Sequence, residues 1–347
     1  MNKVFPVKIV TTQKENTFEI RWTPNNVCNF KCRYCYPGSN TGEYPSPKDI
    51  DLIVKNFNHM LKEYKEKLGK TRIHLKIAGG EPTLWRDLGI FIDKIKQENE
   101  VYVSLITNGS RTLRWWQENG HNIDNIHLTH HVAQADLDHT IAVADLMYQF
   151  GKKITVKVLM DLACWDKCLE AVDYLKKNSK TRFIIMTREV TEPETLTLGG
   201  IKAVSSDDLK YTPEQKKYLS KGLRRIPGLL WFWKNRNLLR SGEIRLHESV
   251  ATLSDGKKVK AKAETYLNKN WNNFKGWSCN IGIEGVFIDW LGDIKGSCNH
   301  TLYGLDYSYN ILDDDFAEKF VLVPKPVTCK NYNCFCLPET HISKFKP

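Results

Sequence analysis

The run Cys28-Asn-Phe-Lys-Cys32-Arg-Tyr-Cys35 follows a short strand-like stretch at residues 18–22. Three thiolates at this spacing can hold three irons of a cubane iron–sulfur cluster and leave the fourth iron open to another ligand. Structural zinc is the alternative, but it usually takes four protein ligands, and no histidine or fourth cysteine is close by in the sequence. The run therefore indicates a reactive iron–sulfur site in the loop after a strand.

Outward from this loop, strand-like and helix-like stretches alternate as far as about residue 190. Short β-like runs are separated by segments with apolar residues every three to four positions, which is typical of amphipathic helices. Such strand–helix units imply a parallel sheet, because parallel neighbours need a crossover connection. The expected strands are residues 18–22, 72–78, 101–107, 125–132, 154–160 and 182–186.

Six units are too few for a full eight-stranded barrel, so we expect an α/β fold built on a partial (β/α)6 TIM-like barrel. Ligands should then bind at the carboxyl ends of the strands. The first helix pattern runs to Leu68, with Ser46 as the expected N-cap, Pro47 at the first helical position and Gly69 as the stop. A later helix pattern should end at Gly151.

Three motifs in this region resemble those of radical S-adenosylmethionine enzymes. In the cysteine triplet, Tyr34 stands directly before the last cysteine, as that family has an aromatic residue there. Gly79-Gly80-Glu81-Pro82 follows the second expected strand, and Thr107-Asn108-Gly109 ends the third. The resemblance covers roughly residues 15–190.

The resemblance implies that a 4Fe–4S cluster on Cys28, Cys32 and Cys35 binds S-adenosylmethionine at its open iron and cleaves it to a 5′-deoxyadenosyl radical. Glu81 would accept the methionine ammonium after a turn in which two glycines allow a close backbone approach. Asn108 would contact the ribose or carboxylate, although a simple turn is the alternative for Asn108-Gly109. The expected cofactor-binding residues are Tyr34, which would border the adenine, and Gly79, Gly80, Glu81, Thr107 and Asn108.

A second group of cysteines lies near the C-terminus. Its arrangement resembles the auxiliary-cluster domain of many such enzymes, which occurs in a longer (SPASM) and a shorter (Twitch) form. Five cysteines suffice for one four-ligand cluster and not for two, so the Twitch form fits better, and a zinc ribbon is the alternative. Which four bind the second 4Fe–4S cluster stays open among Cys279, Cys298, Cys329, Cys334 and Cys336.

The remaining polar and aromatic candidates are weaker. His130 and His131 end the fourth expected strand, and Lys157 and Asp161 belong to the fifth, so any of them could face a substrate. Cys164 and Cys168 are four residues apart on an expected helix, where packing is the simpler interpretation. The aromatic cluster Trp231, Phe232 and Trp233 would cover the site or pack in a core.

We divide the chain into a barrel at residues 1–195, a linker or insertion at 196–275 with a β-hairpin around Asp255-Gly256, and a small β-rich iron–sulfur domain at 276–347. No apolar stretch is long enough to span a membrane, and the first residues lack the pattern of an export signal. We therefore expect a cytoplasmic protein without membrane association.

The substrate is not written in these motifs, because one fold serves many reactions. A peptide or small molecule is the first hypothesis, with an external electron donor such as flavodoxin or ferredoxin. The formal net charge of +11 motivates an RNA-modifying enzyme as the second, although iron–sulfur clusters would lower that charge and nucleic acid is not favoured. A zinc-stabilised binding module without catalysis is the third.

Overall fold

The computed structural model describes most of the chain, and a curved β-sheet dominates it. The described residues are 4–35, 40–44, 46–181, 183–190, 210–220, 223–225, 248–262, 265–266, 269–297, 300–301, 309–330, 334 and 342–347.

The centre of the sheet is a set of parallel strands in chain order, each joined to the next by a helical crossover. This arrangement confirms the α/β class and the partial barrel. The strands are β2 (Thr17–Trp22), β3 (Arg72–Ile77), β4 (Val101–Thr107), β5 (Asn125–His130), β6 (Lys153–Leu159) and β7 (Ile184–Arg188).

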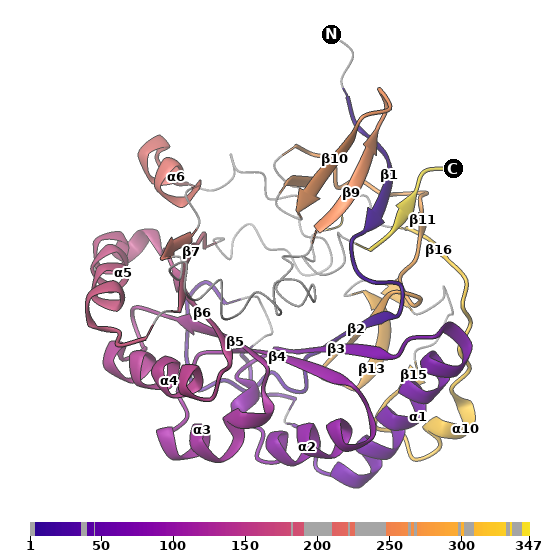
Figure 1. Cartoon of the computed structure of the whole chain (residues 1–347), viewed down its shortest axis with the longest axis horizontal. Coiled ribbons are helices and arrows are strands. Elements are labelled where there is room, and N and C mark those ends of the chain that lie inside the picture. The colour runs from indigo at the N-terminus through magenta and orange to yellow at the C-terminus, as the bar shows by residue number, and fades with distance from the viewer. Residues whose placement is uncertain are drawn as a thin grey trace.

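Helices line the outer side of this arc (Figure 1). The α-helices are α1 (Ile50–Leu68), α2 (Leu88–Glu98), α3 (Leu113–Asn119), α4 (Leu137–Gln149), α5 (Trp165–Asn178) and α6 (Pro213–Ser220). Short 3₁₀ turns accompany them at η1 (Pro82–Leu84), η2 (Gly120–Asn122) and η3 (Leu162–Cys164). Within the described residues, no helix is both long enough and apolar enough to cross a membrane.

The main core lies between the outer face of the sheet and the helices. Alternate residues of β2 are fully buried there, and Phe18 stacks on Tyr64 of α1 with ring centroids 3.8 Å apart. Trp22 packs on Phe57 of the same helix at 5.2 Å. Because successive strand residues point to opposite faces, the residues between them face the concave side.

C-terminal strands continue the barrel sheet. β12 (Gly285–Ile288) pairs in parallel with β2, and the sheet extends through β13 (Asp293–Ser297), which pairs with both β14 (His300–Thr301) and β15 (Tyr309–Asn310). At the other edge, β8 (Leu223–Arg225) pairs antiparallel with β7. The domain boundaries after residues 195 and 275 stay predictions.

A second sheet joins both ends of the described chain. Its order is β10-β9-β1-β17-β11-β16, and Figure 1 shows β1, β9 and β10 together at one side of the arc. The predicted hairpin around Gly256 is confirmed by the pairing of β9 with β10. The strands are β1 (Pro6–Thr11), β9 (Glu248–Leu253), β10 (Lys258–Lys262), β11 (Ser278–Cys279), β16 (Val327–Thr328) and β17 (Lys344–Phe345), and the short helix α10 (Phe316–Lys319) precedes β16.

The predicted start of the first helix is wrong, whereas its end is confirmed. Helix α1 begins at Ile50, where the Asp49 side chain accepts a hydrogen bond from the Leu52 backbone N–H at 2.9 Å. Ser46 does not cap it, because it lies four residues before the helix begins, and its hydroxyl accepts a hydrogen bond from the Asn25 amide at 2.8 Å instead. Gly69 ends the helix in the left-handed region with φ 62°, which favours glycine.

Candidate functional site

The cysteine loop leaves the carboxyl end of β2 and presents three partly exposed thiols. A turn closes it, in which the Cys35 N–H donates to the Cys32 carbonyl at 3.1 Å. The Cys28 sulfur accepts from the Phe30 N–H at 3.4 Å and lies 3.9 Å from the Asn108 amide nitrogen, which donates to it. The predicted motifs after β2, β3 and β4 therefore meet at one edge of the sheet.

The glycine turn after β3 packs directly against the base of the cysteine loop. The Gly80 N–H donates to the Asn25 carbonyl at 3.1 Å, and the Glu81 N–H donates to the Val27 carbonyl at 2.7 Å. A Cβ at Gly80 would lie 2.2 Å from the Val27 carbonyl oxygen, and one at Gly79 would lie 2.6 Å from that of Asn25. These glycines are thus required by the chain's own backbone, independently of any ligand.

Glu81 is a buried centre of hydrogen bonding that connects two strand ends. Its side chain is 1% exposed. It accepts bonds from the N–H and hydroxyl of Thr83 at 3.0 and 2.6 Å, from the Thr107 hydroxyl at 2.7 Å and from the Asn108 N–H at 2.6 Å. Burial raises the pKa of the Glu81 carboxyl, against the effect of these donors. Its contact with a methionine ammonium stays a prediction, because four protein donors already use the carboxylate.

His131 lies just beyond β5 and contacts the cysteine loop. Its Nδ1 atom is 3.1 Å from the Cys32 sulfur and 3.0 Å from the Tyr34 hydroxyl, and the Tyr34 ring lies nearly parallel to the imidazole with centroids 5.9 Å apart. Burial, with a smaller contribution from His130, lowers the pKa of His131 to about 4, so the imidazole is neutral near pH 7. Of the two predicted histidines, this one reaches the site.

His130 points the other way, as strand alternation requires. It is buried, and its Nδ1 atom lies 3.1 Å from the Thr140 hydroxyl of α4. The structure therefore brings His131 to the cysteines and leaves His130 in the layer between sheet and helices.

An ion pair that the sequence did not reveal joins the cysteine loop to the end of β6. Arg33 pairs with Asp161, and the Arg33 Nε is 3.1 Å from an Asp161 carboxylate oxygen. In the sequence, Asp161 is a candidate only because it lies near the end of an expected strand. Arg33 and Asp161 are 128 residues apart, so no local sequence pattern could have predicted that they form an ion pair. Gln134 is a second unpredicted contact, since its amide donates to the Cys32 sulfur at 3.4 Å.

Cys164 and Cys168 lie beside this ion pair, with their sulfurs 3.9 Å apart. Cys168 is fully buried on α5, and burial together with Cys164 raises its pKa to about 12. A thiol with so high a pKa stays protonated and unreactive, which supports the packing interpretation.

The chemistry of the three loop thiols suits the irons of a cubane iron–sulfur cluster. Burial, followed by the neighbouring Cys35 and Cys28, raises the pKa of Cys32 to about 11, so three thiolates need bound cations to coexist. Within the described part of the chain, no three cysteine, histidine or carboxylate side chains converge to hold one ion. A cubane binds each thiolate at a different iron, so its ligands need not meet at one point.

The C-terminal cysteines are only partly described. Cys279 on β11 is paired with Val327 of β16, and Cys329, one residue beyond that strand, donates its N–H to the Trp277 carbonyl, so the two cysteines lie on one face of the paired segments. Burial raises the pKa of Cys279, and the electrostatic effect of Cys329 raises it further. Cys334 packs in the same apolar group as Cys329. The residues Cys298, Cys336, Trp231, Phe232 and Trp233 lie outside the described residues, so the auxiliary cluster stays a prediction.

Comparison with known proteins agrees with this geometry. Residues 22–198 match the family model described as the Radical SAM superfamily, which is more than half of the chain. The chain is 30% identical over 146 residues to a GTP 3′,8-cyclase of Pasteurella multocida, covering 40% of each chain. It is 37% identical over 93 residues to a probable GTP 3′,8-cyclase of Methanocaldococcus jannaschii, covering 26% of this chain and 28% of that relative. The matched region thus spans less than half the length of these relatives.

Among solved structures, the chain is similar in fold to Streptococcus suis SuiB bound to S-adenosylmethionine. The TM-score is 0.50 at 15% sequence identity, and the match covers 87% of this chain and 65% of SuiB. At this level of identity the match bears on the fold, and it supports the partial barrel described above.

Proposed function

The chain belongs to the radical SAM superfamily, and we propose that it cleaves S-adenosylmethionine reductively to a 5′-deoxyadenosyl radical that takes a hydrogen atom from a peptide or small-molecule substrate. The observation that carries this proposal is the meeting of the cysteine loop, the glycine turn and Asn108 at the carboxyl edge of the sheet. The bound cluster and S-adenosylmethionine together supply the electron transfer and the carbon–sulfur bond cleavage.

The chain's own residues would hold these groups in place. Cys28, Cys32 and Cys35 would bind three irons, and the hydrogen bonds from Phe30, Asn108 and Gln134 to the sulfurs would stabilise the thiolates. The neutral His131 would support the Tyr34 hydroxyl beside this loop. The residues proposed to contact S-adenosylmethionine remain Tyr34, Gly79, Gly80, Glu81, Thr107 and Asn108.

We also propose a second 4Fe–4S cluster on four of the five C-terminal cysteines and an external electron donor such as flavodoxin or ferredoxin. The shared face of Cys279 and Cys329 supports the second cluster. The proposal includes a reducing, cytoplasmic location, which keeps cysteine thiolates available to bind such clusters.

The test is production of 5′-deoxyadenosine by anaerobically reconstituted protein with dithionite and S-adenosylmethionine. We expect Cys32→Ala to abolish the product, because the cluster loses one of its three ligands. Cys164→Ala is the matched control, since this thiol lies beside the site without belonging to it, and it should retain activity. Full production by Cys32→Ala, or zinc instead of iron in the protein, would refute the assignment.

The relatives named GTP 3′,8-cyclase suggest a nucleotide as the small molecule. An RNA substrate remains a weaker alternative that rests on the net charge of the chain alone.

A further inference from the structure

One lysine lies in the interior of the second sheet. Lys344 of β17 is 2% exposed, although lysine is almost never buried so completely unless its charge is balanced. It belongs to a row of directly opposed residues that crosses all six strands of that sheet, and the other five members of the row are uncharged. From β10 to β16 the members are Val259, Ala251, Ile9, Lys344, Cys279 and Val327. A charge in this row is costly, because an ammonium loses its hydration there.

Cys279 is the residue that faces this lysine. The two are direct partners in the antiparallel pairing of β11 with β17, so their side chains leave the sheet on the same face. Cys329 lies on that face as well, one residue beyond β16. Burial raises the pKa of Cys279, and the Lys344 ammonium acts in the opposite direction. The lysine charge thus lies on the face that carries two of the thiols proposed to bind the second cluster.

A carbonyl and an aromatic ring fix the position of the ammonium. The Lys344 Nζ donates to the Ile342 carbonyl at 3.0 Å and lies 5.1 Å from the centroid of the Phe274 ring. Phe274 is fully buried and packs in the same apolar group as Cys329. Both contacts determine where the charge lies, and neither of them removes it.

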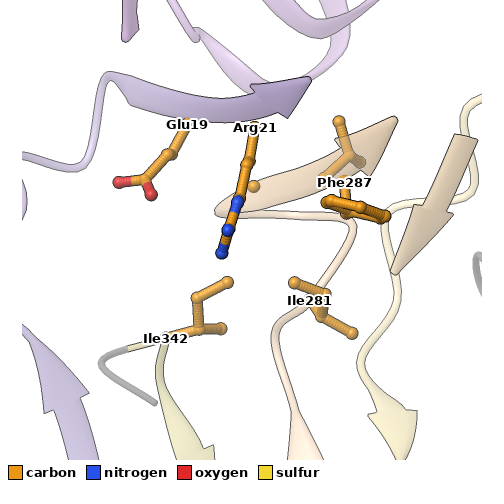
Figure 2. A pocket seen from close by; sticks show the side chains of 7 residues that line it. Glu19, Arg21, Ile281, Phe287 and Ile342 are labelled. Atoms are coloured by element: carbon orange, nitrogen blue, oxygen red, sulfur yellow. The ribbon is translucent and has the colours of Figure 1, made fainter. Parts of the chain in front are cut away.

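Apolar side chains connect the surroundings of Cys279 to the barrel. Figure 2 shows Ile281 and Ile342 pointing toward Arg21 and Phe287 of the barrel sheet, at a hollow that these residues line together. The same two isoleucines form an apolar group with Cys279. Because apolar surroundings screen charge weakly, a cation held there acts strongly on a neighbouring anion.

We propose that Lys344 is a positioning residue of the second iron–sulfur site, whose buried ammonium balances the negative charge of a 4Fe–4S cluster held by Cys279 and Cys329; this inference rests on the second cluster of the proposed function. Such a cluster on four thiolates has a net negative charge, which increases on reduction. A fixed cation beside it therefore stabilises the reduced form more than the oxidised form, so Lys344 should make the cluster easier to reduce.

A nearby carboxylate offers the alternative explanation of this lysine. Glu284 is half-buried, and its oxygens accept from the Asn280 amide at 2.9 Å and from the N–H of Ser343, which directly precedes Lys344, at 2.8 Å. If Lys344 served to balance Glu284, its removal would destabilise the protein even without a cluster, because one partner of a buried pair would be left uncompensated. If it balances the cluster, the apoprotein should tolerate an apolar side chain in its place.

The test is a redox titration, followed by EPR, of anaerobically reconstituted full-length protein in which the three cysteines of the first loop are replaced by alanine. Only the second cluster can then bind. In this background Lys344→Met, which keeps the length of the side chain and removes its charge, should make reduction at least tenfold less favourable. That is a shift of about 59 mV toward more negative potential for a one-electron couple. Lys346→Met is the matched control, because it removes the same charge from an exposed position two residues further along, and it should leave the potential unchanged.

Two further measurements separate the charge of the lysine from its packing. Urea denaturation of the apoprotein should give Lys344→Met a midpoint no lower than that of the wild type, since an apolar side chain replaces a buried charge. Lys344→Arg keeps the charge and should keep the wild-type potential.

Each contrary result has a distinct meaning. An unchanged potential in Lys344→Met, or an equal shift in Lys344→Arg, would overturn the inference and leave the second cluster standing. A lower midpoint of the Lys344→Met apoprotein would also overturn it and would assign the lysine to Glu284. If the protein without the first three cysteines takes up no iron, both the second cluster and the role of Lys344 are refuted. The radical chemistry has its own readout, because production of 5′-deoxyadenosine by the wild type is measured separately.

Discussion

Replacing Gly80 by alanine should separate the glycine turn from the cysteine loop. The added Cβ would lie 2.2 Å from the carbonyl oxygen of Val27 and 2.8 Å from the carbonyl carbon of Asn26. Both are backbone atoms, so no flexible side chain can move aside, and one of the two segments must shift. The shift would break the bonds from Gly80 to Asn25 and from Glu81 to Val27.

The expected loss of stability follows from these contacts. Overpacking costs about 1–3 kcal/mol, and two backbone hydrogen bonds contribute about 0.5–1.5 kcal/mol each, so Gly80→Ala should lower the free energy of unfolding by about 2–6 kcal/mol. Residues 25–27 lead directly into Cys28, so the uptake of iron at this site should fall as well.

The assay is urea denaturation of the apoprotein, followed by iron content after reconstitution. Gly151→Ala is the matched control, because Gly151 has a φ of 72° and a Cβ added there would meet no atom within 4 Å. It therefore reports only left-handed strain, roughly 1–2 kcal/mol. The reasoning is refuted if the two variants unfold at the same urea concentration and take up equal iron.

Three further outcomes are expected. Glu81→Gln should lower the free energy of unfolding by about 1–3 kcal/mol, because the glutamine amide nitrogen is a donor and cannot accept the hydrogen bonds that a carboxylate oxygen accepts. An unchanged melting temperature would contradict this. Burial lowers the pKa of His130 to about 4, so between pH 6.5 and 4 the unfolded chain binds a proton that the folded chain does not. The free energy of unfolding should therefore fall by up to about 3 kcal/mol as the pH is lowered over that range. In urea denaturation, His130→Asn should show a weaker dependence of stability on pH than the wild type. Cys279→Ala should reduce iron from about eight to about four per chain if two clusters bind, whereas Cys164→Ala should keep all of it.

Local patterns in the sequence predict the barrel well, because each strand has its own alternation and each helix its own apolar stripe. The expected strand at 101–107 coincides with β4, and Gly69 ends α1 as glycine stops do. The start of α1 is mispredicted because Ser46 and Pro47 have the local chemistry of a cap. A tertiary contact with Asn25 uses the Ser46 hydroxyl instead.

Contacts between distant segments could not be predicted in the same way. The parallel pairing of β12 with β2 joins residues more than 260 positions apart, and no local turn sequence predicts a pairing over that distance. The role of Glu81 was likewise hidden, since a sequence shows that a carboxylate follows two glycines but not that four donors surround it. The sequence motifs predicted where the site lies, whereas the contacts of each side chain within it depend on the packing of distant segments.

The polarity of the concave face follows from the same alternation that buries the outer face. Strands of a parallel sheet covered on both sides are apolar almost throughout, and full barrels fill their interior with branched side chains. Here β2 alternates apolar and charged residues, with Ile20 in the core and Arg21 on the concave face. The packed core and the charged side chains therefore lie on opposite faces of one sheet, so substitution of Arg21 should not remove contacts of the main core.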